Sequence, residues 1–544
     1  MKTVRDILII LAGIALGSCS EDFLDTTPIT EKTDGNYYST PDEAWEALTG
    51  CYDALQLIYS DGIALPVAAD VMSDLCFGGT GAGDGDGYPM VDEFDNSVSP
   101  SDLNLYEGNW KNYYKGIFRC NSLLKNLDKV DWGKEPELSN TIEAEARFLR
   151  AYFYFDMVRM WEKVPLLTEP SSENIPQSEP DDIYRVITED LLFAIDNARA
   201  RQYGQIASSD YGHVTKWAAE GLLARVYLFY TGYYGQSGLV GLVAKADALS
   251  YVEDIIANSG HGLVDNFADL WPAAATYEAA KAGKPIYDNT YAGENNEEVV
   301  FAIKYTYTST WTGNTDGNHW LVMNGLRKMY WPESGYGFGW GANTVVPEFY
   351  ASWDPDDPRR EASIMAIEEE GINYTEINDV KEYTGYFTKK YTPLSDTLGN
   401  SVAEELGGVS FMIGQYQDYF VIRYADVLLM AAELGSPNAL VYLNQVRGRA
   451  GLGPVPNADK ETIFEERKNE FAFEGLRYWD LLRYDNSLQY AAGHVSYSGT
   501  VKTGGVQAQK TIDGNNLIKT RGLCQIPYNQ ITLSGGVLEQ NPGW

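Results

Sequence analysis

The sequence predicts a mainly α-helical protein, built as a superhelical scaffold of paired helices with long irregular loops inserted between them. Apolar residues recur at intervals of three and four in many segments, which is typical of amphipathic helices. Several of these segments come as pairs joined by short turns. Alternation typical of strands is confined to short pieces such as residues 299–303. With 544 residues, of which 44% are apolar, the chain has ample material for a core.

The first clear helix begins at Thr40-Pro41-Asp42-Glu43, a capping box with proline at the first helical position. Behind it, Ala44, Leu48, Cys51 and Leu55 keep the helical spacing. Similar patterns predict further helices at about residues 102–130, 139–161, 181–199, 213–231, 245–258, 423–434, 437–450 and 460–484.

One pair of helices has the spacing of a tetratricopeptide-type hairpin. Trp217 to Tyr230, followed by Ala244 to Asn258, carries the small and aromatic residues of that motif. The repeat period is not kept strictly, because long loops interrupt it. We therefore expect a right-handed superhelix of helix pairs in which the insertions carry the function.

The start of the chain is predicted to be a targeting segment and not part of the fold. Lys2 and Arg5 precede an apolar run of eleven residues, Ile7 to Gly17, which is too short to cross a bilayer and fits the core of a signal peptide. Leu16-Gly17-Ser18-Cys19 then matches a bacterial lipobox. We expect residues 1–18 to be removed and Cys19 to carry the lipid anchor, with a plain secreted protein as the alternative.

The composition excludes several classes of function. With 41 Lys and Arg against 77 Asp and Glu, the net charge of −36 repels phosphates, so we expect no nucleic-acid partner. No C-x-x-C motif is present, and no two of the four histidines lie within helical reach of each other, so we expect no zinc site and no cofactor. Whether Cys51, Cys76, Cys120 and Cys524 pair with each other is left open.

Two stretches are not scaffold. Residues 76–100 contain a glycine-rich loop from Gly78 to Gly87. Residues 271–420 hold few helical patterns, and within them residues 301–353 contain thirteen aromatic residues, five of them tryptophan. Long loops within a compact domain are usually functional.

A flat aromatic ring can cover the C–H face of a pyranose, while neighbouring polar groups bind its hydroxyls. Glycines beside Trp311, Tyr336 and Trp340 favour open turns, and we take these residues together with Trp320 as candidate ligand contacts. The alternative is that they fill a small core beneath the loops. We assign Trp353 to the core.

Seven motifs, in order, resemble the SusD/RagB family of outer-membrane nutrient-binding lipoproteins from end to end. They are Cys19-x-x-x-Phe23-Leu24-Asp25, Trp110-x-x-Tyr113-x-x-x-Ile117-x-x-Cys120-Asn121, Ala144-Glu145-Ala146-Arg147-Phe148-Leu149-Arg150-Ala151 with Val164-Pro165-Leu166, Ile422-Arg423-Tyr424-Ala425-Asp426-Val427-Leu428-Leu429, Leu443-Asn444-x-Val446-Arg447, Glu465-Glu466-Arg467-x-x-Glu470-x-x-x-Glu474-Gly475-x-Arg477-x-x-Asp480-Leu481, and Gln540-Asn541-Pro542-Gly543-Trp544.

The resemblance implies four tetratricopeptide-like helix pairs in one compact body, made of an N-terminal helical region, 19–270, and a C-terminal region, 271–544. It also implies a non-enzymatic glycan-binding lipoprotein on the outside of the outer membrane. Such proteins pass oligosaccharides to a SusC-like TonB-dependent transporter. Some relatives handle peptides instead, and a purely structural lid for the transporter is a further alternative.

Two aspartates lie where family members often bring an N-terminal loop to the ligand. Asp70 and Asp74 precede the glycine-rich loop, and Tyr88 follows it. We take all three as candidate ligand contacts, with helix capping as the alternative for the aspartates. The acidic residues from Asp84 to Asp95 do not keep the order of an EF-hand, so a solvated loop is favoured over a calcium site.

One carboxylate cluster could indicate a glycosidase. Glu466, Glu470 and Glu474 share a helical face, and hydrolysis of a glycoside needs two carboxylates about 5–10 Å apart. Arginines lie on the same segment at ion-pair spacing, for example Glu474 and Arg477. We favour structural ion pairs and expect no enzymatic activity. The identity of the glycan cannot be read from the spacing.

Overall fold

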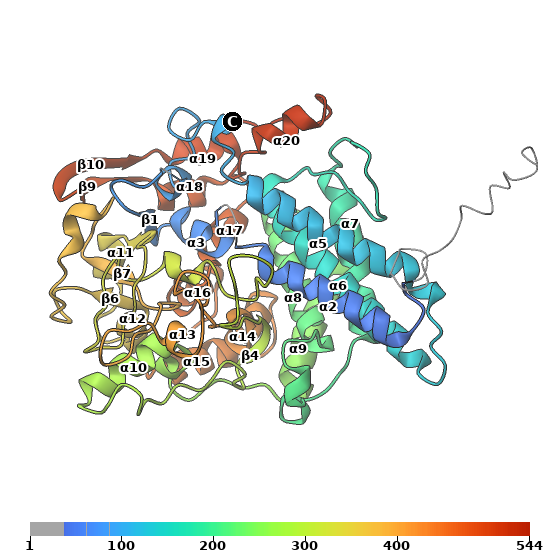
Figure 1. Cartoon of the computed structure of the whole chain (residues 1–544), viewed down its shortest axis with the longest axis horizontal. Coiled ribbons are helices and arrows are strands. Elements are labelled where there is room, and N and C mark those ends of the chain that lie inside the picture. The colour runs from blue at the N-terminus through green and yellow to red at the C-terminus, as the bar shows by residue number, and fades with distance from the viewer. Residues whose placement is uncertain (1–36, 61–62, 86) are drawn as a thin grey trace, which may run out of the picture.

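The computed structural model describes residues 37–60, 63–85 and 87–544, so the expected signal peptide and lipidation site at Cys19 lie outside the described residues. Two regions lie side by side (Figure 1). Long helices gather on one side of the molecule, and the short helices, strands and long loops gather on the other. The prediction of a mainly α-helical chain is confirmed.

The helices and strands have the following bounds. In the first half of the chain the helices are α2 (Pro41–Leu57), α3 (Leu65–Val71), α4 (Gly87–Val91), α5 (Glu107–Asn126), α6 (Pro136–Trp161), α7 (Pro180–Asn197), α8 (Lys216–Tyr234), α9 (Lys245–Asn258) and α10 (Pro272–Lys281). In the second half they are α11 (Pro347–Ser352), α12 (Pro358–Ser363), α13 (Val402–Glu405), α14 (Tyr424–Glu433), α15 (Ala439–Arg449), α16 (Lys460–Glu470), α17 (Arg477–Tyr484), α18 (Gln489–Val495), α19 (Gly514–Thr520) and α20 (Tyr528–Leu533). The strands are β1 (Cys76–Gly78), β2 (Gly238–Leu239), β3 (Val243–Ala244), β4 (Val299–Ile303), β5 (Asn343–Val345), β6 (Ile364–Ala366), β7 (Tyr386–Thr388), β8 (Tyr419–Arg423), β9 (Tyr497–Thr503) and β10 (Val506–Ile512).

The scaffold is a series of helices in which each packs on the next. α5 packs on α6, α6 on α7, α7 on α8 and α8 on α9; α9 then contacts α14, which packs on α15 and α16. This is the arrangement of stacked helix pairs that the sequence predicts. The predicted cap at the start of α2 is present: the Thr40 hydroxyl accepts a hydrogen bond from the Glu43 amide at 3.3 Å, and the Glu43 carboxylate accepts one from the Ser39 amide at 2.8 Å.

α6 is the central helix of the first region. α2, α5 and α7 all pack on it, and from Ala144 to Trp161 almost every side chain is buried. Arg150 fastens this helix to two neighbours: its guanidinium donates to Asp190 of α7 and to Asn121 of α5, each at 2.8 Å. A buried arginine is stable here because its charge is paired and its donors are used.

Residues 460–484 form two helices, where the sequence pattern predicts one. α16 ends at Glu470, and the chain turns before α17 begins at Arg477. Gly475 lies in this turn with φ +71°, and a Cβ there would lie 2.8 Å from the Pro66 backbone. The break between α16 and α17 therefore results from close packing against α3. The periodicity of the local sequence does not indicate this contact.

A small antiparallel sheet brings the two long loops together. Its strand order is β1-β5-β7-β6, and Phe77 of β1 lies opposite Thr344 of β5. The glycine-rich loop leaves the end of β1, and the aromatic-rich segment enters the start of β5. Because the strands are antiparallel, these two ends are neighbours.

The four cysteines within the described residues, Cys51, Cys76, Cys120 and Cys524, are buried free thiols.

Candidate functional site

The structure separates the candidate aromatic residues into exposed and buried groups. Trp311 is 63% exposed, and Trp340 is partly exposed. Trp320 and Tyr336 are buried, with at most 2% of the side chain exposed. The Trp320 indole donates to the Tyr305 hydroxyl at 3.4 Å, and the Tyr336 hydroxyl donates to Glu370 at 2.8 Å. These two rings belong to the core, so we do not retain them as ligand contacts.

The two candidate aspartates hold the start of α17. Asp70 accepts a hydrogen bond from the Gly475 amide at 3.1 Å, and Asp74 accepts two from Arg477, each at 2.8 Å. Burial raises the pKa of Asp70. Burial also raises the pKa of Asp74, but Arg477 outweighs this effect and the net shift is downward. Both carboxylates have a structural partner, which favours the structural alternative for them over contact with a ligand.

Tyr88 is buried as well. Its hydroxyl accepts a hydrogen bond from the Ala64 amide at 2.9 Å, and it packs in the core behind the glycine-rich loop. A short loop with many glycines carries few side chains of its own, so the large residue that follows it fills the space beneath. Tyr88 is therefore removed from the candidate site.

The segment from Gly337 to Trp340 presents alternate residues to solvent. Cβ atoms added at Gly337 and Gly339 would lie 2.7 Å from the Leu394 carbonyl oxygen and 2.0 Å from the Asn324 carbonyl oxygen. Only glycine fits at these close approaches. Side chains of an extended segment alternate between two sides. Phe338 and Trp340 are both partly exposed, which fits projection away from the neighbouring backbone.

Further partly exposed rings adjoin Phe338. The Phe338 ring lies 5.5 Å from Tyr330 and 4.9 Å from Phe411, centroid to centroid. We call these three rings, together with Trp340 two residues along the chain from Phe338, the aromatic face. Its rings come from two loops that are distant in sequence, which the tertiary fold brings together.

Polar groups border the aromatic face. Glu404 accepts a hydrogen bond from the Phe411 amide at 2.9 Å. The pKa of Tyr330 is raised, first by burial and then by the charge of Glu404. Lys328 is exposed, and its ammonium lies 2.7 Å from Asp379. Hydroxyl-rich ligands need such carboxylates and ammonium groups beside the rings.

The glycine-rich loop lies against the same segment and is held by one buried arginine. The Gly79 and Thr80 amides donate to the carbonyl oxygens of Ala342 and Gly341 at 2.7 and 3.0 Å. Arg327, whose side chain is 4% exposed, pairs with Asp84 of the loop and with Asp379, each at 3.0 Å. The loop and the aromatic segment therefore form one connected surface.

Trp311 lies on a neighbouring loop, residues 306–316. Backbone hydrogen bonds close this loop between Thr306 and Asp316 at 2.9 Å and between Thr310 and Asn314 at 2.8 Å. Tyr307, 37% exposed, lies beside Gly407 and Gly408, in the loop that also carries Phe411. Tyr307 therefore joins the Trp311 loop to the loop that carries Phe411.

Sequence reasoning missed Tyr330, Phe338, Phe411 and Tyr307. Phe338 could have been found, because it lies between the two glycines that set the alternation. Phe411 and Tyr307 carry no local signal, since their place depends on the packing of loops 306–316 and 403–414 against each other.

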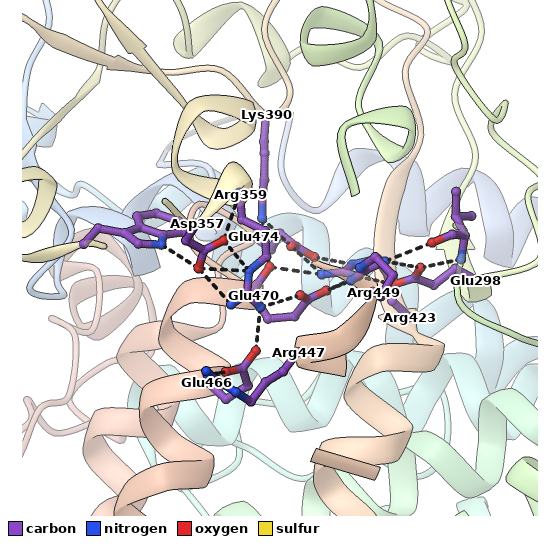
Figure 2. A network of polar contacts seen from close by, with 12 residues as sticks. Glu298, Asp357, Arg359, Lys390, Arg423, Arg447, Arg449, Glu466, Glu470 and Glu474 are labelled. Carbon is purple, nitrogen blue, oxygen red and sulfur yellow. Dashed lines mark hydrogen bonds and ion pairs between the residues drawn. The ribbon is translucent and has the colours of Figure 1, made fainter. Parts of the chain in front are cut away.

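The glutamates that could indicate a glycosidase form a buried ion network (Figure 2). Glu466, Glu470 and Glu474 are each at most 2% exposed. Their partners are Arg359, Arg423, Arg449, Arg447 and Lys390. The preference for structural ion pairs is thereby confirmed, although Arg477 pairs with Asp74 and Glu474 pairs with Lys390 and Arg423. Among the described residues, no group of three His, Cys, Asp or Glu side chains could hold a metal ion.

The fold and the surface together define a helix-repeat binding scaffold whose long loops carry exposed rings. Residues 286–544 match the SusD family, and residues 89–228 match a family described as starch-binding and associating with the outer membrane. The chain belongs to the SusD/RagB family, as the seven motifs indicated.

Relatives are similar over most of their length. A SusD-like protein of Bacteroides ovatus is 26% identical over 497 residues, which cover 88% of this chain and 82% of the relative. SusD-like protein P2 of Formosa agariphila is 23% identical over 575 residues, which cover 100% of both chains.

Solved structures share the fold. A laminarin-binding SusD-like protein superposes with a TM-score of 0.70 at 26% identity, covering 93% of this chain and 100% of that one. Surface glycan-binding protein A from Bacteroides thetaiotaomicron, in complex with laminarihexaose, superposes with a TM-score of 0.70 at 22% identity, covering 92% of this chain and 100% of that one.

Proposed function

We propose that this protein is a lipoprotein on the outside of the outer membrane, which binds an oligosaccharide or polysaccharide on the aromatic face. The observation that carries the proposal is the group of partly exposed rings, Tyr330, Phe338, Trp340 and Phe411, bordered by Glu404 and Lys328. Stacked rings with polar neighbours recognise the apolar face and the hydroxyls of a sugar at the same time.

A β-glucan such as laminarin is the first ligand to test. Two structural relatives carry laminarin or laminarihexaose in their descriptions, and one matching family is described as starch-binding. The aromatic face is open, so binding by the isolated protein is expected to be weak. Weak binding suits a protein that passes its ligand on.

The anchor and the partner belong to the same proposal. Cys19 carries the lipid, which holds the protein at the membrane that the family description names. None of the described helices is long and apolar enough to cross a membrane. The recipient of the glycan is a SusC-like TonB-dependent transporter, over which the protein acts as a lid.

Two other functions remain as alternatives. A peptide-binding relative would use the same scaffold but would need backbone edges and side-chain pockets in place of exposed rings. A glycosidase is disfavoured because Glu466, Glu470 and Glu474 are buried and ion-paired, and the relatives are described as binding proteins. We propose a protein without enzymatic activity.

Affinity electrophoresis of the purified protein against a polysaccharide panel that includes laminarin tests the proposal. We expect retardation by at least one glycan, loss of retardation in Trp311→Ala/Trp340→Ala, and no release of reducing ends. Phe118→Ala is the matched control, because Phe118 is 53% exposed on α5, outside the loops that carry the aromatic face. Retention of full binding by the double variant would contradict the proposal.

A further inference from the structure

A crevice that is separate from the aromatic face opens between α2, the loop at residues 203–215 and the end of β4. Its larger chamber has a volume of about 310 Å³ and its inner chamber about 50 Å³. Tyr211, Gly212, His213, Ala302 and Lys304 line both chambers, so the two chambers adjoin each other. The larger chamber reaches Asp316, at the base of the loop that carries Trp311.

One wall of the crevice is fixed by Lys304. Its aliphatic stem covers Gly212, which has φ +91° and where a Cβ would lie 2.4 Å from the lysine Cγ. Its ammonium is paired with Asp418 and donates to the Asn295 amide oxygen at 2.8 Å. The charge of Lys304 is thus compensated, and the lysine does not attract an anionic ligand.

The remaining polar groups of the lining are mostly acceptors. Gln56 donates through Nε2 to the Lys304 carbonyl oxygen at 2.6 Å, which leaves its Oε1 as an acceptor. His213 donates through Nδ1 to the buried Glu145 carboxylate at 2.7 Å, which fixes the orientation of the ring in the wall of the crevice. The Asp316 carboxylate accepts no hydrogen bond from any of the described residues.

The inner end of the crevice holds another acceptor. Burial lowers the pKa of His261 to about 4, so the ring is neutral at pH 7. Its Nδ1 lies 3.0 Å from the Glu297 carbonyl oxygen, which fixes the proton on that nitrogen. Its Nε2 is buried and has no partner among the described residues. A buried acceptor without a donor is costly, and a small movement toward a hydroxyl in the inner chamber would satisfy it.

An aromatic ring completes the lining. Tyr211 is 36% exposed and borders both chambers. Asp53, on the opposite wall, is already paired with Arg119 and adds no free charge. A ring beside several acceptors, one of them the Asp316 carboxylate, which is unpaired among the described residues, suits a ligand that is rich in hydroxyl donors and carries no negative charge.

We propose that this crevice is a second binding site, which takes one or two sugar units of a neutral saccharide. The sugar stacks on Tyr211 and donates its hydroxyls to Gln56 and Asp316. The volume of the larger chamber is at the small end of the range for ligand pockets. This inference goes beyond the proposed function, because it does not involve the aromatic face.

The four histidines of the chain make a direct test practicable, since each gives its own NMR signal after ¹³C labelling. His213 and His261 line the crevice. His319 bonds to Ser309 of the Trp311 loop at 3.0 Å and reports on that loop, while His494 lies in α18 and is the control. The labelled full-length protein is titrated with laminarihexaose, then with maltohexaose and cellohexaose.

We expect the signals of His213 and His261 to shift with at least one oligosaccharide while that of His494 stays in place. Tyr211→Ala should lower the apparent affinity measured from these shifts about tenfold, and the His319 signal should be unaffected. Tyr211→Phe should retain them. Trp340→Ala should leave the crevice signals unchanged, which separates this site from the aromatic face.

Two results would overturn the inference. The first is an absence of movement at His213 and His261 with every oligosaccharide; if His319 still moves, the proposed function stands and only the crevice fails. The second is movement of His213 with a lysine-containing tripeptide but with no sugar, which would identify the crevice as a site for cations.

Discussion

Arg327 and Asp84 connect two loops that are more than 240 residues apart in the sequence: Nη1 of the arginine lies 3.0 Å from a carboxylate oxygen of the aspartate. The arginine is buried and also holds Asp379, whereas the Asp84 side chain is 47% exposed. A buried side chain, Arg327, therefore attaches the glycine-rich loop to the aromatic segment.

Substitution of Arg327 and substitution of Asp84 should lower the free energy of unfolding by different amounts. Arg327→Met removes a buried guanidinium that bonds Asp84 and both the carboxylate and the carbonyl oxygen of Asp379, and should lower the free energy of unfolding by about 1–3 kcal/mol. Asp84→Asn breaks a half-exposed pair and should cost less than about 1 kcal/mol. Denaturant unfolding measures both. Equal effects would mean that the pair contributes no more than a surface ion pair.

The glycines of the loop should differ sharply in their tolerance of alanine. A Cβ at Gly79 would lie 2.1 Å from the Gly341 carbonyl oxygen, and one at Gly81 would lie 1.7 Å from the Arg327 guanidinium. We expect Gly79→Ala to displace the loop and to speed hydrogen exchange of the amides at residues 79–82. Gly83→Ala is the matched control, because a Cβ there meets nothing within 4 Å. Similar exchange in the two variants would contradict the packing of this loop.

The buried ion network should be sensitive to the loss of a single carboxylate. Burial raises the pKa of Glu470, but Arg449, Arg423 and Arg359 outweigh burial and the net shift is downward. Glu470→Gln leaves these arginines undercompensated and should cost about 3–5 kcal/mol in the free energy of unfolding. Glu465→Gln, on the same helix but 42% exposed, should cost less than about 1 kcal/mol. A loss below 1 kcal/mol for Glu470→Gln would refute the structural role of the network.

Glu220 should make stability decrease as the pH rises. Burial raises its pKa from 4.5 to about 8, beyond what Lys216 offsets. Between these two values the folded protein holds a proton that the unfolded chain releases, so the stabilisation is complete below pH 4.5 and is lost as the pH rises to 8. The difference in the free energy of unfolding between Glu220→Gln and the wild type should shift in favour of the variant by on the order of 3 kcal/mol between pH 5 and pH 8. Urea unfolding at the two pH values measures this gain, and parallel pH dependence of the two proteins would contradict it.

The scaffold was predictable from the sequence because its helices carry local signals. The capping box at Thr40 and the 3-4 spacing of α5 to α9 gave elements close to those observed. The break at Gly475 was not predictable, because it arises from contact with Pro66. The hairpin of β9 and β10 was also missed, although Gly504 and Gly505, with φ +59° and +78°, are typical of a tight turn.

The candidate site was only partly predictable. Flanking glycines correctly indicated that Trp311 and Trp340 lie at the surface, but the same rule placed Tyr336 there, whose ring stacks on Tyr277 in the core. A glycine beside an aromatic residue indicates a flexible backbone, but it does not indicate whether other residues cover the ring. The structural partners of Asp70 and Asp74 were not predictable, because Gly475 and Arg477 follow about 400 residues later.

Calorimetry with laminarihexaose is the most direct test of the claim that the aromatic face binds a glycan. We predict measurable binding to the wild type, a loss of about tenfold or more in Trp340→Ala, and an unchanged affinity in Phe118→Ala. If laminarihexaose fails, the same three proteins are titrated with the glycan found by electrophoresis. Equal affinities of the wild type and Trp340→Ala would contradict the account.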